Sequence, residues 1–367
     1  MRDSFLKRIE IQVRRFLIFV LGFFIHRRNQ VLETFDFRSS KILFIRQDRI
    51  GDVLVSTPIF ASIKTHYPSA TVDVLLSENN YFVLKNDSFI RKCWIYQKKV
   101  GKVISLMRII RKEQYDFAVD MMDNPSVTST LLCLLSGAKI NVGIAKNNTY
   151  VYDMAVPMLS RRETHIIDRI AQLLIPFHID PAAESLSLRY FTSPASDEFA
   201  KRWISLNHLN DCPLVGVNIS AGGEARFWGI NQYRSFLSFI TERYPEFHII
   251  LLYQPTDIAR ANKIGEGNKD IVLSPVTNTF DQFAAIIKKL SFLVSPDTSA
   301  IHLASAFHIP SVVLYVQSDK SLRIWEPYKT DYEVVVADVD DLSTIQVSDV
   351  QTAFTKLIER YRAQSTI

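Results

Sequence analysis

The sequence is poor in cysteine, and nothing in it suggests disulfides or a zinc site. Its 367 residues include three cysteines, Cys93, Cys133 and Cys212, which lie far apart and form no CxxC pair or Cys/His ligand spacing. Long apolar runs are also missing: the run over residues 16–25 has ten residues, whereas a membrane-spanning helix needs about 20. No GxGxxG and no Walker lysine follows the first strand-like run, so the usual dinucleotide and P-loop sites are excluded.

Positive charge is concentrated at one end of the chain. The sequence has 43 lysines and arginines against 38 aspartates and glutamates, which gives a net charge of +5, and residues 1–30 account for that excess. The remaining body is neutral, whereas a nucleic-acid-binding protein would carry basic stripes on its fold. Nucleic-acid binding is therefore not expected.

The basic N-terminal segment also has apolar residues at helical spacing. Phe5, Ile9, Val13 and Phe16 recur at intervals of three or four, and most bases lie off that stripe. No small-residue cleavage site follows the apolar run, which argues against a signal peptide. The pattern is typical of an amphipathic helix lying in an anionic membrane surface, and a terminal helix packed on the chain's own core is the alternative.

Two series of alternating strand-like and helix-like segments follow. The first has strands expected at 41–46, 71–76, 116–121 and 139–144 and helices at 53–66, 103–112 and 126–136. The second has strands expected at 213–220, 248–253, 271–273, 292–295 and 311–316 and helices at 231–243, 257–263, 280–290 and 299–307. Such alternation predicts parallel sheets covered by helices on both faces.

The expected fold class is therefore α/β, with two Rossmann-like domains facing a central cleft. We expect a basic amphipathic segment over 1–35, an N-terminal domain over 36–190, a C-terminal domain over 191–347 and a last helix over 348–367. Residues 191–211 are expected to form a polar linker with a short helix. Ser348, with Gln351 three residues later, predicts a capping box for the last helix.

The segment after the first strand contains a candidate catalytic carboxylate. Asp52 follows Gly51 at the expected start of a helix, and ligands of open α/β sheets bind at the carboxyl ends of strands. Gly51 is expected to let the backbone turn tightly. A carboxylate there is placed to act as a general base for a hydroxyl, and simple capping of the helix is the alternative.

Two segments of the second series are candidate phosphate sites. Gly222 and Gly223 allow backbone N–H groups to approach an anion before a helix N-terminus, and Arg226 adds charge suited to a diphosphate. An ordinary turn with a solvated arginine is the alternative. At another strand end, residues 297–299 have side chains suited to cap a helix next to an anion site, although capping alone would account for only one of the three. His302 follows, and a histidine packed in the core is the alternative to a ligand-binding one.

These segments resemble the glycosyltransferase family 9 enzymes, the ADP-heptose:lipopolysaccharide heptosyltransferases. The family's opening motif is matched by IGDVL at 50–54 with Thr-Pro at 57–58, and its mid-chain glycine turn by residues 220–229. Its DTG-x-x-H-x-A signature is matched by DTSAIHLA at 297–304, and its weaker H-x-x-D-R segment by 165–169. The resemblance runs from about residue 41 to the last helix and implies the GT-B architecture.

The resemblance also implies a role for each matching residue. Asp52 would deprotonate the acceptor hydroxyl, with Arg49 and Gly51 on the acceptor side. Arg226 would bind the diphosphate and stabilise the departing nucleotide. The other donor-binding residues would be Ser220, Gly222 and Gly223 at the phosphates, Asp257 at the ribose, and Asp297, Thr298, Ser299 and His302 around the sugar and phosphates.

Some residues depart from the family pattern. Arg226 stands where the family usually has Lys, Ser299 replaces Gly and points to another donor sugar, and Gly229 replaces Pro. A rival signal is the DxD of Asp338 and Asp340, which serves as a metal–nucleotide site in another glycosyltransferase fold. Its position near the C-terminus favours a polar turn, so no metal is expected.

The resemblance implies an inverting, metal-independent glycosyltransferase. It would move a heptose or related sugar from an ADP-sugar to a lipopolysaccharide inner-core or related surface-glycan acceptor, at the cytoplasmic face of the inner membrane. No cofactor beyond the donor substrate is expected. The alternatives are a nucleotide-sugar-binding protein without transferase activity and a nucleotide-sugar epimerase of the same fold.

Overall fold

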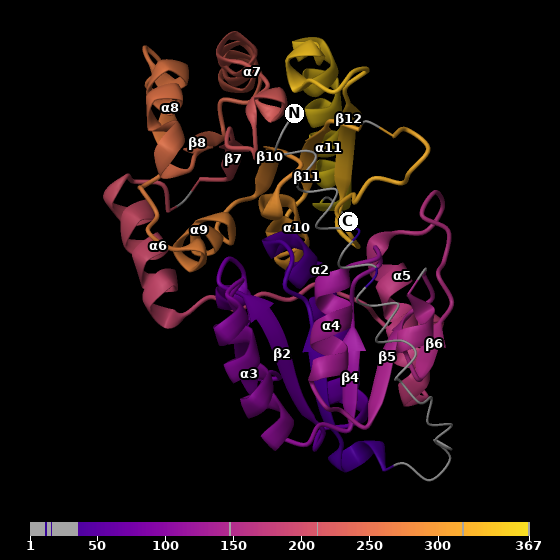
Figure 1. Ribbon diagram of the computed structural model, residues 1–367. Coiled ribbons are helices and arrows are strands. Elements are labelled where there is room, and N and C mark those ends of the chain that lie inside the picture. Colours follow the sequence, from indigo (N-terminus) through magenta and orange to yellow (C-terminus); the bar gives the residue numbers. More distant parts are fainter. Residues whose placement is uncertain are drawn as a thin grey trace. The chain divides into compact units, whose positions relative to one another are not determined.

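The computed structural model describes residues 12, 16, 36–146, 148–210, 212–317 and 319–365. The predicted N-terminal amphipathic helix over 1–35 lies outside this part of the chain except for two residues. The chain divides into two compact units, one that ends at Leu186 and one that begins at Ser187. Each unit is an α/β structure built on one parallel sheet (Figure 1). No helix within the described ranges has the length and apolar character to cross a membrane.

The N-terminal unit contains a six-stranded parallel sheet in the order β3-β2-β1-β4-β5-β6. Its strands are β1 (Lys41–Ile45), β2 (Thr71–Ser77), β3 (Lys92–Tyr96), β4 (Phe117–Asp120), β5 (Ile140–Ile144) and β6 (Met154–Val156). Its helices are α2 (Ile50–His66), α3 (Val100–Lys112), α4 (Val127–Leu135) and α5 (Ile166–Ala171). Helix α2 packs against α5, and α3 packs against α4.

The C-terminal unit repeats this plan with the strand order β12-β11-β10-β7-β8-β9. Its strands are β7 (Leu214–Asn218), β8 (His248–Leu252), β9 (Ile271–Leu273), β10 (Phe292–Pro296), β11 (Ser311–Tyr315) and β12 (Tyr332–Val336). Its helices are α6 (Pro194–Leu206), α7 (Ile230–Arg243), α8 (Ile258–Gly265), α9 (Phe280–Ile287), α10 (Ser299–Ala306) and α11 (Val347–Ser365).

The central strands are buried on both faces, as parallel sheets require. Four successive residues of β1, Ile42–Ile45, and all of β7 are buried. The strand orders reverse between β1 and β4 in one unit and between β7 and β10 in the other. Ligands of open α/β sheets bind at the carboxyl ends of strands at such reversal points. The topology therefore selects one edge of each sheet as the place to look for a site.

The structure confirms the strands and helices expected from the sequence, with shifts at their ends, and adds elements the pattern does not reveal. Strands β3, β6 and β12 and helix α5 are additional. Strand β3 has one buried side chain, that of Trp94, and β6 has three residues, so neither gives a continuous apolar run. The predicted capping box at Ser348 is wrong, because α11 begins one residue earlier, at Val347, and Ser348 lies inside the helix.

Candidate active site

The candidate catalytic carboxylate lies at the carboxyl end of β1, where α2 begins. The helix starts at Ile50 with Arg49 as its N-cap residue. Gly51 therefore lies in the first helical turn, and the expectation that it forms a tight turn before the helix is wrong. Asp52 is therefore not the N-cap residue but the N3 residue, and its carboxylate caps the helix start from there. Its Oδ2 atom accepts a hydrogen bond from the backbone N–H of Arg49, at 3.3 Å. This contact fixes one oxygen of the carboxylate at the helix start.

Arg46 fixes the other side of the Asp52 carboxylate. Its Nη2 lies 3.2 Å from Asp52 Oδ1, and its Nε donates to the backbone carbonyl of Asp52 at 3.0 Å. Its Nη1 donates to the carbonyl of Met121, which follows β4, at 2.8 Å. Arg46 thus ties the ends of β1 and β4 to the start of α2. It is 1% exposed, whereas the Asp52 side chain keeps 12% of its surface accessible.

A second carboxylate, Asp48, shares the Arg46 guanidinium. Its Oδ2 lies 3.4 Å from Arg46 Nη1, and its Oδ1 is buried with no hydrogen-bond partner among the described residues. Burial raises the pKa of Asp48 to about 6, against the attraction of Arg46 and with a contribution from Asp52. Burial alone would lower the pKa of Arg46, but the carboxylates of Asp48 and Asp52 raise it above its ordinary value.

Asp123 links this group to the H-x-x-D-R segment. His165 caps α5, since its Nδ1 accepts from the N–H of Ile167 at 3.2 Å. Arg169, on α5, donates to Asp123 Oδ2 at 2.8 Å, and Arg161 lies 3.1 Å from the same oxygen. The motif therefore serves to anchor α5 against the acidic residue that follows β4. Sequence reasoning missed Arg46, Asp48 and Asp123, although Arg46 lies directly at the end of the first strand.

The donor-side residues cluster at the carboxyl ends of β7 and β8. Ser220 Oγ donates to Asp257 Oδ2 at 2.7 Å and accepts from the backbone N–H of Gln254 at 2.8 Å. The structure therefore brings together the serine after β7 and the aspartate at the start of α8, which are 37 residues apart. Both were predicted to face the donor, one at the phosphates and one at the ribose.

The glycine pair lies in an exposed turn that leads into a short 3-10 helix, Glu224–Arg226. A Cβ added at Gly222 or Gly223 would meet nothing within 4 Å, and Gly223 is extended, with φ of 163°. The expected helix N-terminus does not follow directly, because α7 begins only at Ile230. Arg226 is half-buried, and no carboxylate pairs with it within the described part of the chain.

Trp228 and Gly229 hold this turn against the core of the unit. The Trp228 side chain is fully buried, and its Nε1–H donates to the carbonyl of Ile345 at 3.0 Å. Gly229 has a φ of +124°, so a proline, whose φ is near −65°, cannot occupy this position in the present conformation. The glycine that replaces the proline of the family pattern therefore fits the backbone conformation found here.

Arg260, on α8, is a further charged residue that sequence reasoning missed. Its Nη1 lies 3.6 Å from Asp257 Oδ1, and its Nη2 donates to Glu224 at 2.6 Å. Its guanidinium carbon also lies 4.4 Å from the Phe227 ring centroid. Its hydrogen bond to Glu224 raises the pKa of Arg260. The arginine therefore connects the exposed glycine turn with Asp257.

Asn218 and Thr298 join the ends of β7 and β10, where the strand order reverses. Asn218 Nδ2 donates to Ser295 Oγ at 3.0 Å and lies 3.4 Å from Thr298 Oγ1. Thr298 is the N-cap of α10 and accepts from the N–H of Ala300. Asp297 and Ser299 flank it and are half-buried. The four predicted donor residues at this strand end are Asp297, Thr298, Ser299 and His302.

His302 is 5% exposed on α10, and its ring centroid lies 6.5 Å from that of Trp325. This position fits a packed histidine. The DxD residues are far less enclosed: Asp338 and Asp340 are exposed in the turn after β12, and Asp338 lies 3.6 Å from Lys320 Nζ. The described residues contain no group of three or more His, Cys, Asp or Glu side chains placed to hold a metal ion.

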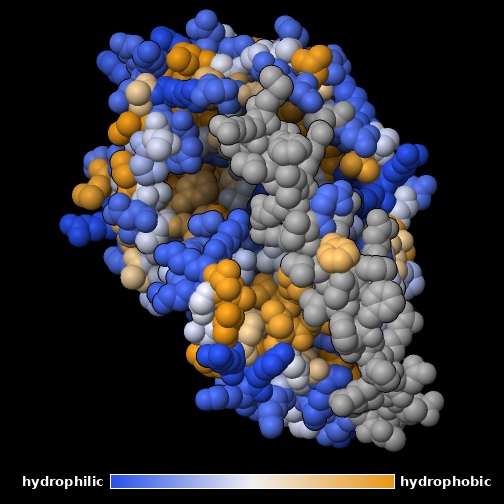
Figure 2. All heavy atoms as spheres, in the orientation of Figure 1, coloured by the Kyte–Doolittle hydropathy of each residue, from blue (hydrophilic) through white to orange (hydrophobic). Residues whose placement is uncertain are grey.

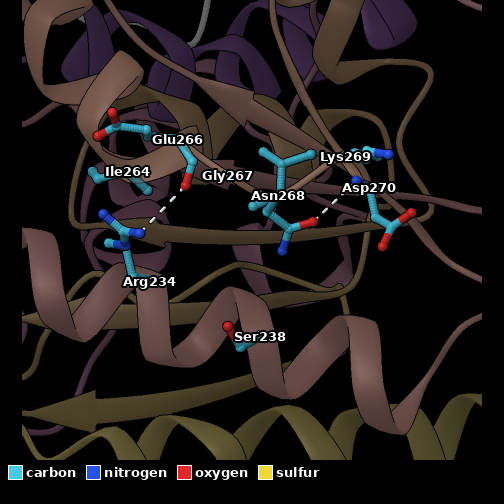
Figure 3. A pocket seen from close by; sticks show the side chains of 9 residues that line it. Arg234, Ser238, Ile264, Glu266, Gly267, Asn268, Lys269 and Asp270 are labelled. Atoms are coloured by element: carbon cyan, nitrogen blue, oxygen red, sulfur yellow. Dashed lines mark hydrogen bonds between the residues drawn. The ribbon is translucent and has the colours of Figure 1, made fainter.

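A separate pocket of about 430 Å³ lies between α7 and the loop that joins α8 to β9. Figure 3 shows Arg234 reaching from α7 to the carbonyl of Glu266. Lys269 and Asp270 lie at the other end of its lining, so both charge signs are present. None of the residues predicted from the sequence to act on donor or acceptor lines this pocket.

The comparisons with known proteins agree with the two-sheet architecture. Residues 103–352 match the family model of glycosyltransferase family 9 (heptosyltransferase). Lipopolysaccharide heptosyltransferase 3 of Escherichia coli is 23% identical over 339 residues, which cover 84% of this chain and 96% of that protein.

Two solved structures share the fold. A glycosyltransferase family 9 protein from Veillonella parvula superposes with a TM-score of 0.75 at 17% identity, covering 88% of this chain and 97% of its own. An E. coli heptosyltransferase solved with ADP-2-deoxy-2-fluoro heptose gives a TM-score of 0.69 at 15% identity, covering 86% and 99%. This chain therefore shares the GT-B fold of those two proteins.

Proposed function

Because the chain belongs to glycosyltransferase family 9, the heptosyltransferase family, we propose that it is an inverting, metal-independent transferase that uses an ADP-sugar. The donor sugar is a heptose or a close relative, and the acceptor is a lipopolysaccharide inner core or a related surface glycan. The names of the relatives support this assignment: one is a lipopolysaccharide heptosyltransferase, and a solved neighbour was bound to an ADP-heptose analogue.

The observation that carries the proposal is the fixed position of the Asp52 carboxylate. Arg46 and the N–H of Arg49 hold its two oxygens, while part of the side chain stays accessible. A carboxylate so oriented is suited to accept a proton from an incoming hydroxyl. In the proposed reaction Asp52 takes the acceptor proton and the acceptor oxygen attacks the anomeric carbon. The bond from that carbon to the diphosphate then breaks with inversion, and ADP leaves.

The donor side of the proposal rests on the cluster around Asp257. Ser220, Gly222, Gly223 and Arg226 lie on the segment after β7 and are proposed to bind the diphosphate. Arg226 has no carboxylate partner in the described chain, so its charge is available to the departing ADP. Asp257 is proposed to contact the ribose. Residues 297–299 and His302 are proposed to surround the sugar and phosphates.

The partners and location are proposed on the same basis. The acceptor is lipid-linked, so the protein would work at the cytoplasmic face of the inner membrane, with Arg49 and Gly51 on the acceptor side. The family match is to a transferase, which removes the reason to propose an epimerase. A nucleotide-sugar-binding protein without turnover remains the second candidate, because Arg226 and Ser299 depart from the family pattern at donor positions.

The test is ADP release from ADP-heptose in the presence of a core-oligosaccharide acceptor. Asp52→Asn preserves the shape of the side chain and should lower kcat by about 10²–10⁴-fold, the usual contribution of a general base. Its affinity for ADP should not change. The matched control is Glu78→Gln, an exposed carboxylate of the same unit.

A folded Asp52→Asn variant that keeps wild-type kcat would remove Asp52 as the base. Tight ADP binding by the wild type without turnover of any sugar donor would favour the second candidate.

A further inference from the structure

The partly exposed side of α4 is apolar. Val127, Leu131 and Leu134 are half-buried and also pack against the core cluster of this unit, and Leu135 is 38% exposed. They recur at i, i+4, i+7 and i+8, which places them on one side of the helix. The opposite side, with buried Leu132 among its residues, packs on the core. A surface helix ordinarily presents polar residues to solvent, so this face is unusual.

One flank of α3 extends this apolar surface. Val100 is 79% exposed and Ile104 is 47% exposed, and they lie one helical turn apart. Arg111 continues the same side of α3 and donates through Nε to the carbonyl of Leu135 at 2.9 Å, which places this flank beside the end of α4. In Figure 2 hydrophobic side chains gather over α3 and α4, with hydrophilic side chains above and below them.

We define the α3–α4 face as the side chains that make up this surface. They are Val100, Ile104, Val127, Leu131, Leu134 and Leu135.

A basic rim lies along the α3 side of the α3–α4 face. Residues 98–112 contain no aspartate or glutamate and six exposed bases. Within the described chain, none of the six forms an ion pair with a carboxylate. These bases are Lys98, Lys99, Lys102, Arg108, Arg111 and Lys112.

Charge decides which occupant suits this face. The chain's own residues 1–30 carry seven bases and two acids, so covering the face with them would place positive charge against the basic rim. A second copy packed face to face would place one basic rim against another. An anionic lipid membrane complements both the apolar side chains and the basic rim. Its acyl chains are apolar, and its headgroups carry negative charge at the boundary with water.

We propose that the α3–α4 face docks the N-terminal unit onto an anionic lipid surface. The apolar side chains enter the boundary between headgroups and acyl chains, and the rim bases pair with lipid phosphates. The inference rests on exposed side chains and charge, not on the proposed reaction. It would add a second membrane contact, on the unit that we propose binds the lipid-linked acceptor.

The first test measures partition of the full chain onto vesicles of phosphatidylcholine with and without phosphatidylglycerol. Each base near an anionic surface contributes about fivefold to binding, so Lys98→Glu/Lys99→Glu/Lys102→Glu should weaken partition by roughly 100-fold or more. The control is Lys201→Glu/Arg202→Glu, which reverses two exposed bases of α6 in the other unit. Its partition onto the vesicles should not show this loss.

The second test removes apolar contact without changing charge. Ile104→Ser/Leu135→Ser should weaken partition by about tenfold or more, because both side chains would otherwise enter the lipid boundary. The matched control is Leu206→Ser, since Leu206 is 69% exposed on α6. All these positions are exposed, and circular dichroism checks that the variants fold.

Equal vesicle affinity of the wild type and the α3–α4 variants would overturn the proposal. So would a dimer in solution that the same substitutions dissociate, because the face would then bind a second copy. Turnover of a water-soluble acceptor fragment should be unchanged in the α3–α4 variants. Loss of vesicle binding with intact turnover therefore separates this inference from the fate of the proposed reaction.

Discussion

Replacing Asp48 by asparagine should change how the stability of the N-terminal unit depends on pH. Burial raises the pKa of Asp48 from 3.8 to about 6, because desolvation outweighs the attraction of Arg46, 3.4 Å away. The nearby Asp52 carboxylate acts in the same direction. In the fold, the Asp48 carboxyl therefore keeps its proton over a pH range in which the unfolded chain has lost it.

The size of the effect follows from the two values. Between pH 3.8 and about 6 the folded state binds more protons than the unfolded state, so the free energy of unfolding falls as the pH rises. At about 1.4 kcal/mol for each pH unit, Asp48 removes up to ~3 kcal/mol by pH 7. The Asp48→Asn variant cannot ionise at this position. Its stability should therefore exceed that of the wild type by a margin that grows by up to ~3 kcal/mol between pH 4 and pH 7.

The assay is urea-dependent hydrogen exchange resolved to peptides from β1 and α2, which confines the readout to this unit. Measurements at pH 4.5 and pH 7.5 compare the wild type, Asp48→Asn and the exposed-carboxylate control Glu78→Gln. The control should follow the wild type. If the pH dependence of Asp48→Asn is parallel to that of the wild type, Asp48 does not carry a raised pKa and the described electrostatics of the site are wrong.

Three other substitutions test the donor side. Gly229→Ala should destabilise the C-terminal unit by about 1–3 kcal/mol in thermal unfolding, because φ is +124° and a Cβ would lie 2.2 Å from Gln232 Oε1; an unchanged Tm would contradict this. Trp228→Phe should cost about 1–3 kcal/mol, since it leaves the buried carbonyl of Ile345 without its donor; urea unfolding measures it. Arg260→Ala should weaken ADP binding by roughly tenfold in calorimetry, because it removes the guanidinium that holds the Asp257 carboxylate. An unchanged affinity for ADP would exclude a role of Arg260 in positioning Asp257.

Much of the fold could be predicted because the central strands are buried on both faces. Strands such as β1 and β7 give continuous apolar runs, which pattern reasoning detects. The edge strand β3 buries only Trp94, and its neighbours Lys92 and Ile95 are exposed, so its pattern resembles a loop. Edge strands pack on one side, and periodicity carries less information about them.

The positions of the candidate site's motifs along the chain could be predicted from the sequence. The contacts between their side chains could not. The sequence shows that Asp52 follows the first strand, but the pairing of Arg46 with Asp48 and Asp52 depends on how the chain folds between β1 and α2. The same limit applies to Arg260, whose partner Glu224 is 36 residues away. A positive φ, such as that of Gly229, also has no signature in a single sequence, where Gly is compatible with many conformations.

The central claim is that this protein uses an ADP-sugar as donor, and calorimetric titration of nucleotides tests it most directly. ADP and ADP-heptose would be compared with UDP- and GDP-sugars, first without metal and then with magnesium. The account predicts binding of the adenine nucleotides without metal, and a loss of that affinity in Arg226→Ala. Preference for a uridine or guanosine donor, or binding that requires magnesium, would contradict it.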